Sequence, residues 1–281
     1  MNRSYRTVWN STLGAFVAVA ETARTPGGGA SGSVRAVGVS AALALATLAA
    51  SGVSQAATFT ASNEAELITA INQANASTDP SSTINLTTGI VVSTSLPTIQ
   101  GNVSVLPGGA GITIRSPGGA SLALQGGANY GDIGNISIGN IAGTAGTLSL
   151  QGAGTTAYGT QILATGGQAN IRVLDGAVLR SGSGASLGTA SVVVSGPDSA
   201  FTIGVTYAQQ GGTLEVSKGG KLESRLGPNL GTTAGFTGVV TGAGSRLAST
   251  QGAINLGASG SALLTVADGA VISAKSGSSA V

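Results

Sequence analysis

The chain has 281 residues, of which 8% are charged, 3% are aromatic and 42% are hydrophobic, and it contains 47 glycines. Plentiful Val, Ile and Leu in alternating runs exclude intrinsic disorder. Cysteine and histidine are absent, which excludes disulfides, thiolate metal sites and the usual nucleophile–base pairs. Four Arg and one Glu precede Ala57, whereas eight basic and nine acidic residues follow, so the net charge of +2 comes from the start of the chain. We therefore expect no nucleic-acid partner.

Residues 1–56 have the layout of a signal peptide, with an extension over residues 1–24 and the signal peptide proper over residues 25–56. Arg35 precedes an apolar run over residues 36–50, and small residues at Ser54 and Ala56 follow. This order predicts a helical apolar segment and cleavage between Ala56 and Ala57. The alternative is a membrane anchor, but a spanning helix needs about 20 apolar residues.

The extension carries a resemblance to a known family. Its pattern of residues resembles the extended signal peptide region of type V secretion proteins, chiefly autotransporters, and includes Tyr5, Arg6, Val8, Trp9, Asn10, Gly14 and Glu21. The resemblance implies export by the Sec machinery, cleavage by signal peptidase, and display at the outer membrane or outside a Gram-negative cell. One departure is that relatives place several basic residues before the apolar run, where this chain has only Arg35. An amphipathic helix of the mature protein is the alternative, and it would leave Trp9 and Phe16 without a core.

Residues 57–80 are predicted to cap a repeat structure. A short strand over residues 58–61 precedes a helical pattern whose apolar positions are Leu67, Ile68, Ile71 and Ala74. Asn63 and Glu66 have the spacing of a capping box. Because stacked β-coils need a terminal cap, we expect this helix to cover the first coil. A helix that binds a partner protein is the alternative.

Residues 81–281 contain a repeat of about 23 residues. The apolar residue before each turn glycine recurs at Leu124, Leu150, Val173, Val194, Val216, Val240 and Val266. Two versions alternate, because Val173, Val216 and Val266 precede a glycine by three residues, whereas Val194 and Val240 precede one by two. This period predicts an all-β fold, a parallel β-helix of roughly nine coils with these residues stacked in an inward ladder.

Two segments of the repeat extend the resemblance. Residues 212–224 (GTLEVSKGGKLES) and 191–204 (SVVVSGPDSAFTIG) resemble repeats of autotransporter passenger domains, which fold as right-handed β-helices. No stretch of alternating strands with aromatic girdles follows, so the outer-membrane β-barrel translocator is expected to be absent from this chain. This predicts either a truncated chain or a translocator encoded elsewhere.

Parallel β-helices also include polysaccharide-active enzymes, whose sites gather Asp with Arg or Lys on one wall. Here Asp175, Lys218 and Asp268 immediately precede corner glycines in alternate units, about 10 Å apart if the units stack. We interpret them as turn residues, and Glu215, Lys221 and Glu223 as parts of a solvated wall. The sequence therefore predicts no enzyme activity, no cofactor and no metal.

Aromatic residues in the less regular segments are the candidates for ligand contacts, with core or corner packing as the alternative for each: Tyr130, Tyr158, Tyr207 and Phe236. The favoured hypothesis is a surface-displayed structural and interaction protein, an adhesin for host cells, matrix or neighbouring bacteria, with adhesion implied by the resemblance. The alternatives are a secreted polysaccharide-active β-helix enzyme and a non-functional gene fragment.

Overall fold

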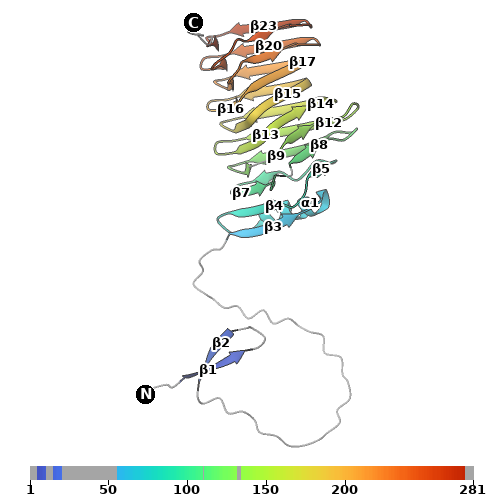
Figure 1. Cartoon of the computed structure of the whole chain (residues 1–281). Coiled ribbons are helices and arrows are strands. Elements are labelled where there is room, and N and C mark those ends of the chain that lie inside the picture. The colour runs from blue at the N-terminus through green and yellow to red at the C-terminus, as the bar shows by residue number, and fades with distance from the viewer. Residues whose placement is uncertain (1–4, 11–14, 21–55, 110, 132–133, 276–281) are drawn as a thin grey trace, which may run out of the picture. The chain divides into compact units, whose positions relative to one another are not determined.

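The computed structural model describes residues 5–10, 15–20, 56–109, 111–131 and 134–275, and the chain divides into two units, Met1–Ala50 and Ser51–Val281. In the first unit, strands β1 (Tyr5–Asn10) and β2 (Ala15–Ala20) form an antiparallel pair. The leader residues Gly14 and Glu21 and the apolar run before the cleavage site lie outside the described residues. The second unit is a parallel β-solenoid (Figure 1).

The solenoid has three walls of parallel strands, and each coil visits walls B, C and A in that order. Wall A consists of β6 (Ile99–Gln100), β9 (Ala120–Gln125), β12 (Ala145–Gln151), β14 (Gln168–Leu174), the ends of β15 (Val178–Ser195) and β17 (Thr206–Ser217), β20 (Phe236–Thr241) and β23 (Ala262–Ala267). Wall B consists of β3 (Ala57–Ala61), β4 (Ser82–Leu86), β7 (Val103–Leu106), β10 (Asn129–Tyr130), the starts of β13 (Thr156–Ala164) and β15, β16 (Ala200–Ile203), β18 (Lys221–Ser224), β21 (Arg246–Ser249) and β24 (Val271–Ala274). Wall C consists of β5 (Ile90–Val92), β8 (Ile112–Ile114), β11 (Ile136–Ile138), the end of β13, the middle of β15, the start of β17, β19 (Pro228–Leu230) and β22 (Asn255–Leu256).

The strand register on wall A confirms the predicted ladder. Each residue of the series stands opposite the next: Leu124, Leu150, Val173, Val194, Val216, Val240 and Val266. All but the last have no exposed surface, whereas Val266, in the last described coil, is 45% exposed. The spacing of turn glycines in the sequence therefore gives the register of the wall correctly.

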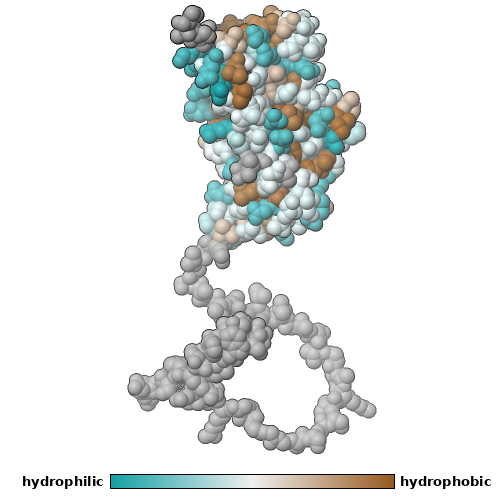
Figure 2. Space-filling view, viewed as in Figure 1, coloured by the Kyte–Doolittle hydropathy of each residue, from teal (hydrophilic) through white to brown (hydrophobic). Residues whose placement is uncertain are grey.

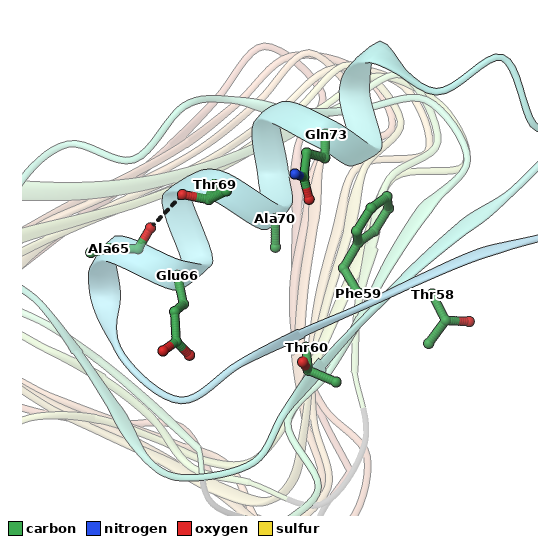
Figure 3. Close-up of a pocket in the computed structure, with 8 residues that line it drawn as sticks. All are labelled: Thr58, Phe59, Thr60, Ala65, Glu66, Thr69, Ala70 and Gln73. Carbon is green, nitrogen blue, oxygen red and sulfur yellow. Dashed lines mark hydrogen bonds between the residues drawn. The ribbon is translucent and has the colours of Figure 1, made fainter. Parts of the chain in front are cut away.

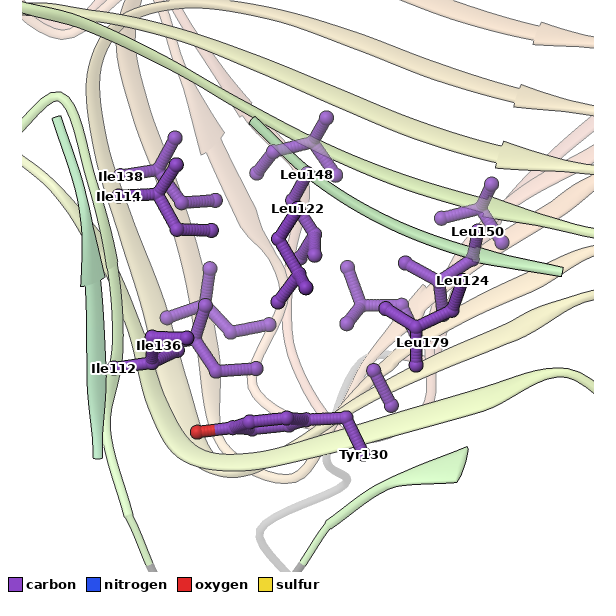
Figure 4. Close-up of a cluster of buried hydrophobic side chains, with 14 of the residues drawn as sticks. Ile112, Ile114, Leu122, Leu124, Tyr130, Ile136, Ile138, Leu148, Leu150 and Leu179 are labelled. Carbon is purple, nitrogen blue, oxygen red and sulfur yellow. The ribbon is translucent and has the colours of Figure 1, made fainter. Parts of the chain in front are cut away.

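The interior is filled by aliphatic side chains that stack on their equivalents in the next coil (Figure 4). On wall C, Ile112 stands opposite Ile136, and on wall A Leu122 stands opposite Leu148. Side chains of these walls and of wall B point toward one another in Figure 4 and close the interior. Each such buried aliphatic contributes about 1.5–3 kcal/mol before conformational entropy is subtracted.

The corner between walls A and B explains why two versions of the repeat alternate. In one version the turn glycine donates its N–H to a buried hydroxyl of the next coil, as Gly176 N does to Ser199 Oγ at 2.9 Å. The same hydroxyl donates to the carbonyl of Ser195 at 2.8 Å. The equivalent pairs are Gly127 with Thr155 and Gly219 with Ser245. The structural unit is therefore a pair of coils, one donating the glycine N–H and one accepting it.

The predicted turn residues lie at this same corner in a left-handed backbone conformation. The φ angles of Asp175, Lys218 and Asp268 are 55°, 53° and 54°, and that of Asp198 is 61°. Residues other than glycine adopt this conformation rarely, and Asp is among those that tolerate it best. Asp175 and Lys218 follow strands β14 and β17, which are separated by the intervening strand of β15.

Helix α1 (Glu64–Ala76) covers the first coil, as predicted. It buries Leu67, Ala70, Ile71 and Ala74, while Ile68 is half-buried against the core. Asn63 caps the helix by accepting a hydrogen bond from Glu66 N at 3.0 Å. The reciprocal bond differs from the predicted capping box, because the Glu66 carboxylate accepts from Ser62 N, at 2.8 Å, one residue before the cap.

Side chains at both ends of α1 form hydrogen bonds with the coil that follows the helix in the chain. Glu64, in the first turn, accepts from the backbone N–H groups of Ser93 and Thr94, each at 2.8 Å, and from both hydroxyls. Asn75, in the last turn, donates to Thr98 O and accepts from Gln100 N, as the backbone of a neighbouring strand would. These side chains thus satisfy backbone groups whose equivalents in later coils are hydrogen-bonded to a neighbouring coil.

Candidate interaction surfaces

An open groove of about 470 Å³ lies between β3 and α1 (Figure 3). Phe59 and Thr60 of β3 line one side, and Ala65, Thr69 and Gln73 of α1 line the other. Its only ionisable lining residue, Glu66, is occupied as a helix cap, and the bonds from Ser62 hold the pKa of its carboxyl below the usual range. The groove therefore offers an apolar floor and hydroxyls, but its one carboxylate is already engaged.

The outward side of wall A carries a straight row of small polar side chains. We call it the polar column: Ser121, Thr147, Asn170, Ser191, Thr213 and Thr237 stand opposite one another in successive coils. Strands of one sheet are about 4.8 Å apart, so the column repeats hydroxyl or amide groups at that interval. Figure 2 shows one face of the body as a mixture of hydrophilic and hydrophobic residues, many of intermediate hydropathy.

The acidic residues of the repeat are dispersed over corners and walls. Asp175, Asp198 and Asp268 belong to the corner between walls A and B, whereas Glu215 is on wall A and Glu223 on wall B. Within the described ranges, no group of three or more His, Cys, Asp or Glu side chains is placed to hold a metal ion. Asp132 lies outside the described residues.

Three of the four aromatic candidates are core residues, which is the alternative that the sequence left open for each of them. Tyr130 and Tyr207 have no exposed surface and Phe236 is 3% exposed, because their strands direct them into the interior. Tyr207 donates a hydrogen bond to the buried amide of Gln209, and burial raises the pKa of its hydroxyl. Tyr158, on wall B, is the exposed one at 37%, so it alone of the four presents a surface to a ligand.

Sequence reasoning missed a cluster of cations on the outward side of wall B. We call it the basic strip: Arg180, Lys221, Arg225, Arg246 and Lys275. Lys221 stands opposite Arg246, although the two are 25 residues apart in the chain. Aligning the repeats on the strand after the turn glycine, as well as on the residue before it, would have brought these cations together.

The predicted cleavage site adjoins the solenoid. Ala57 is the first residue of β3, paired with Ser82, and Ala56 before it is exposed. Cleavage between Ala56 and Ala57 stays a prediction, and it would leave the new N-terminus at the start of wall B. Among the described residues, no helix is long and apolar enough to cross a membrane.

These features define a β-solenoid, a helix-capped stack of parallel coils in the second unit of the chain. Residues 1–50 match the extended signal peptide of the type V secretion system. No curated protein and no solved structure matches the chain. The chain thus combines a type V secretion leader with a β-solenoid body, as in an autotransporter passenger. Its destination is the cell surface or extracellular space of a Gram-negative bacterium, reached through Sec export and a translocator.

Proposed function

We propose that the solenoid body acts outside the cell as a structural and interaction protein, an adhesin, and that it has no catalytic role. The observation that carries this proposal is the polar column, which repeats small hydrogen-bonding groups along wall A in strict register. A surface of this kind suits many weak contacts in parallel with another surface, whose avidity exceeds that of any single contact. The dispersed carboxylates support a binding role over an enzyme of the polysaccharide-lyase or hydrolase type.

Adhesion can be measured with the exported protein, purified from the periplasm of a Gram-negative host and coupled to beads. We expect the beads to be retained on host-cell monolayers, on immobilised matrix proteins or on bacterial cells, above beads coated with an unrelated protein. Absence of retention on all three surfaces, with an intact β-sheet circular dichroism spectrum, would contradict the proposal. Release of new reducing ends from a panel of polysaccharides would favour an enzyme instead.

The role of wall A is tested by replacing three hydroxyls of the polar column with methyl groups. The variant Thr147→Val/Thr213→Val/Thr237→Val keeps side-chain shape and strand preference while removing hydrogen-bonding groups. We expect it to lose at least half of the bead retention. The matched control, Thr83→Val/Thr113→Val/Thr202→Val, makes the same change on walls B and C, and we expect it to adhere like the parent protein.

A further inference from the structure

The basic strip concentrates positive charge in a body whose overall charge is slightly negative. The residues after Ala57 carry eight basic and nine acidic side chains, a net charge of −1. Five of those eight cations lie on wall B, or directly after one of its strands, in the coils from β15 to β24. Glu223 is the acidic residue on the same part of the wall, so the net charge of this part is +4. Three more acids, Asp175, Asp198 and Asp268, lie in the adjoining corner together with the cation Lys218. Charge is therefore segregated along one wall.

The cations point outward and are accessible. Residues alternate in and out along each strand, and the inward partners Leu222 and Leu247 are fully buried. Arg180, Arg225, Arg246 and Lys275 are exposed, and Lys221 is half-buried.

The fold itself does not require these charges. Lys221 and Arg246 stand directly opposite each other, and like charges in such a cross-strand pair are destabilising. In the N-terminal coils the same outward column is neutral, with Thr58, Thr83, Ser104, Asn129 and Thr156 in register. Arg246 is held in place by Ser273 at 3.1 Å and by Glu223, whose carboxylate lies 3.8 Å from its Nε.

We propose that the basic strip binds an acidic polysaccharide that runs along the solenoid axis. The cations are separated by one or two coils along the axis, about 5 or 10 Å, which suits an extended polymer with an anionic group on every sugar or every second sugar. Tyr158 is the one exposed aromatic residue beside the strip among the described residues, opposite Arg180, whereas a single-stranded nucleic acid would use a series of aromatic side chains for base stacking. Export to the cell surface or beyond brings wall B into contact with polysaccharides of that environment.

This second surface goes beyond the adhesion proposed for wall A and does not depend on it. The polar column and the basic strip lie on different walls, so each can fail without the other. Loss of bead adhesion with retained polysaccharide binding would contradict the first proposal alone, and the reverse result would contradict the second alone.

The test is retention of the exported protein on immobilised dextran sulfate and polygalacturonate, with neutral dextran as the reference. We expect retention on one or both anionic polymers, elution by salt, and no retention on dextran. Retention on dextran sulfate alone indicates a sulfated ligand, and retention on polygalacturonate indicates a uronate. Passage through both columns, or tighter binding to single-stranded DNA than to either polymer, would overturn the proposal.

Matched variants test whether polysaccharide binding depends on the basic strip or on the net charge of the protein. Lys221→Gln/Arg246→Gln should lower affinity by about two- to thirty-fold, as the loss of two exposed ion contacts implies. Arg115→Gln/Arg172→Gln removes the same charge away from wall B and should leave affinity unchanged. Glu223→Gln should raise affinity, because it removes the negative charge inside the strip. Equal losses in the two double variants would show that binding follows net charge, which would contradict the proposed site.

Discussion

The corner between walls A and B and the corner between walls C and A hold successive coils together in different ways. At the A–B corner, a buried hydroxyl joins neighbouring coils, as Ser199 does between Gly176 N and its own coil's Ser195 O. At the C–A corner, the backbones themselves approach closely, as at Gly167, whose N–H is bonded to Gly139 O. The first corner uses one kind of side chain at a fixed spacing, whereas at the second the contact is made by the backbones. One solenoid can therefore be periodic at one corner and irregular at another.

The largest expected effect comes from the core that both corners enclose. Val216 lies directly before an A–B corner and is fully buried between Val194 and Val240. Val216→Asp places an unpaired carboxylate there and should lower the free energy of unfolding by roughly 3–5 kcal/mol. Urea denaturation followed by circular dichroism measures the change.

The neighbouring outward position is the control for Val216. Glu215 is exposed, and the buried Ser217 Oγ that donates to it at 2.7 Å also lies 2.9 Å from Ser195 Oγ, so Ser217 keeps a partner without the carboxylate. Glu215→Lys should therefore change the free energy of unfolding by less than about 1 kcal/mol. If both variants unfold at the same urea concentration, the assignment of inward and outward positions is incorrect.

At the C–A corner, Gly167→Ala tests the close approach of the backbones. A Cβ atom at Gly167 would lie 2.2 Å from Thr144 O and 2.5 Å from Ile141 O, so the coils would have to move apart. We expect a loss of about 2–3 kcal/mol in the urea titration, typical of overpacking. Gly118→Ala, with no atom within 4 Å of the added Cβ, should be neutral or slightly stabilising, because alanine restricts the unfolded chain, and a similar loss there would contradict the role of the close approach.

At the A–B corner, Ser199→Ala tests the hydroxyl that joins two coils. The substitution leaves Gly176 N without its partner in a buried position and should destabilise the body by about 1–2 kcal/mol. Ser149→Ala, on the outward side of wall A, should change stability by less than about 0.5 kcal/mol. The thermal midpoints of the two variants give the comparison, and equal midpoints would refute a role for the hydroxyl at the corner.

The same contrast explains how much of the fold the sequence could predict. The A–B corner repeats Val, turn residue and Gly at near-constant spacing, so the ladder through Val173, Val194 and Val216 could be aligned correctly. The C–A corner varies in length, and the contact of Gly167 with an earlier coil involves backbone atoms that no residue pattern identifies.

For the candidate sites, the sequence identified the kinds of residue but not whether each side chain points into the core or toward solvent. Tyr130 and Tyr207 lie in short or irregular strands, where alternation is too brief to distinguish the inward from the outward side. The basic strip was missed for the opposite reason. Its members alternate with core residues as expected, but their proximity depends on a register of 25 residues between Lys221 and Arg246, and net charge alone conceals it.

The smallest expected effect concerns the first C–A corner of the described solenoid. There the Glu64 carboxylate occupies the place that a preceding coil has at the later corners. Burial raises the pKa of the Glu64 carboxyl, but bonds from Ser93 and Thr94 outweigh it, so the pKa lies below 4.5. Because the folded-state pKa is depressed, this stabilisation is complete above the unfolded-state pKa and is lost as the pH falls through the folded-state pKa. Glu64→Gln should lose about 0.3–1 kcal/mol at pH 7, as for a charge at a helix start, and the difference from the parent should shrink toward pH 3.

Thermal midpoints of both proteins between pH 7 and pH 3 measure this difference, and comparison of the two cancels the titration of all other acids. Ser93→Ala removes one hydroxyl donor to Glu64. In that background the difference in thermal midpoint between Glu64 and Glu64→Gln at pH 7 should be smaller. A gap that is constant with pH would mean that the carboxylate's charge is irrelevant. The first coil would then be held by the packing of α1 and by Asn75 alone, and the cap would resemble the C–A corners above it, where backbone and shape suffice.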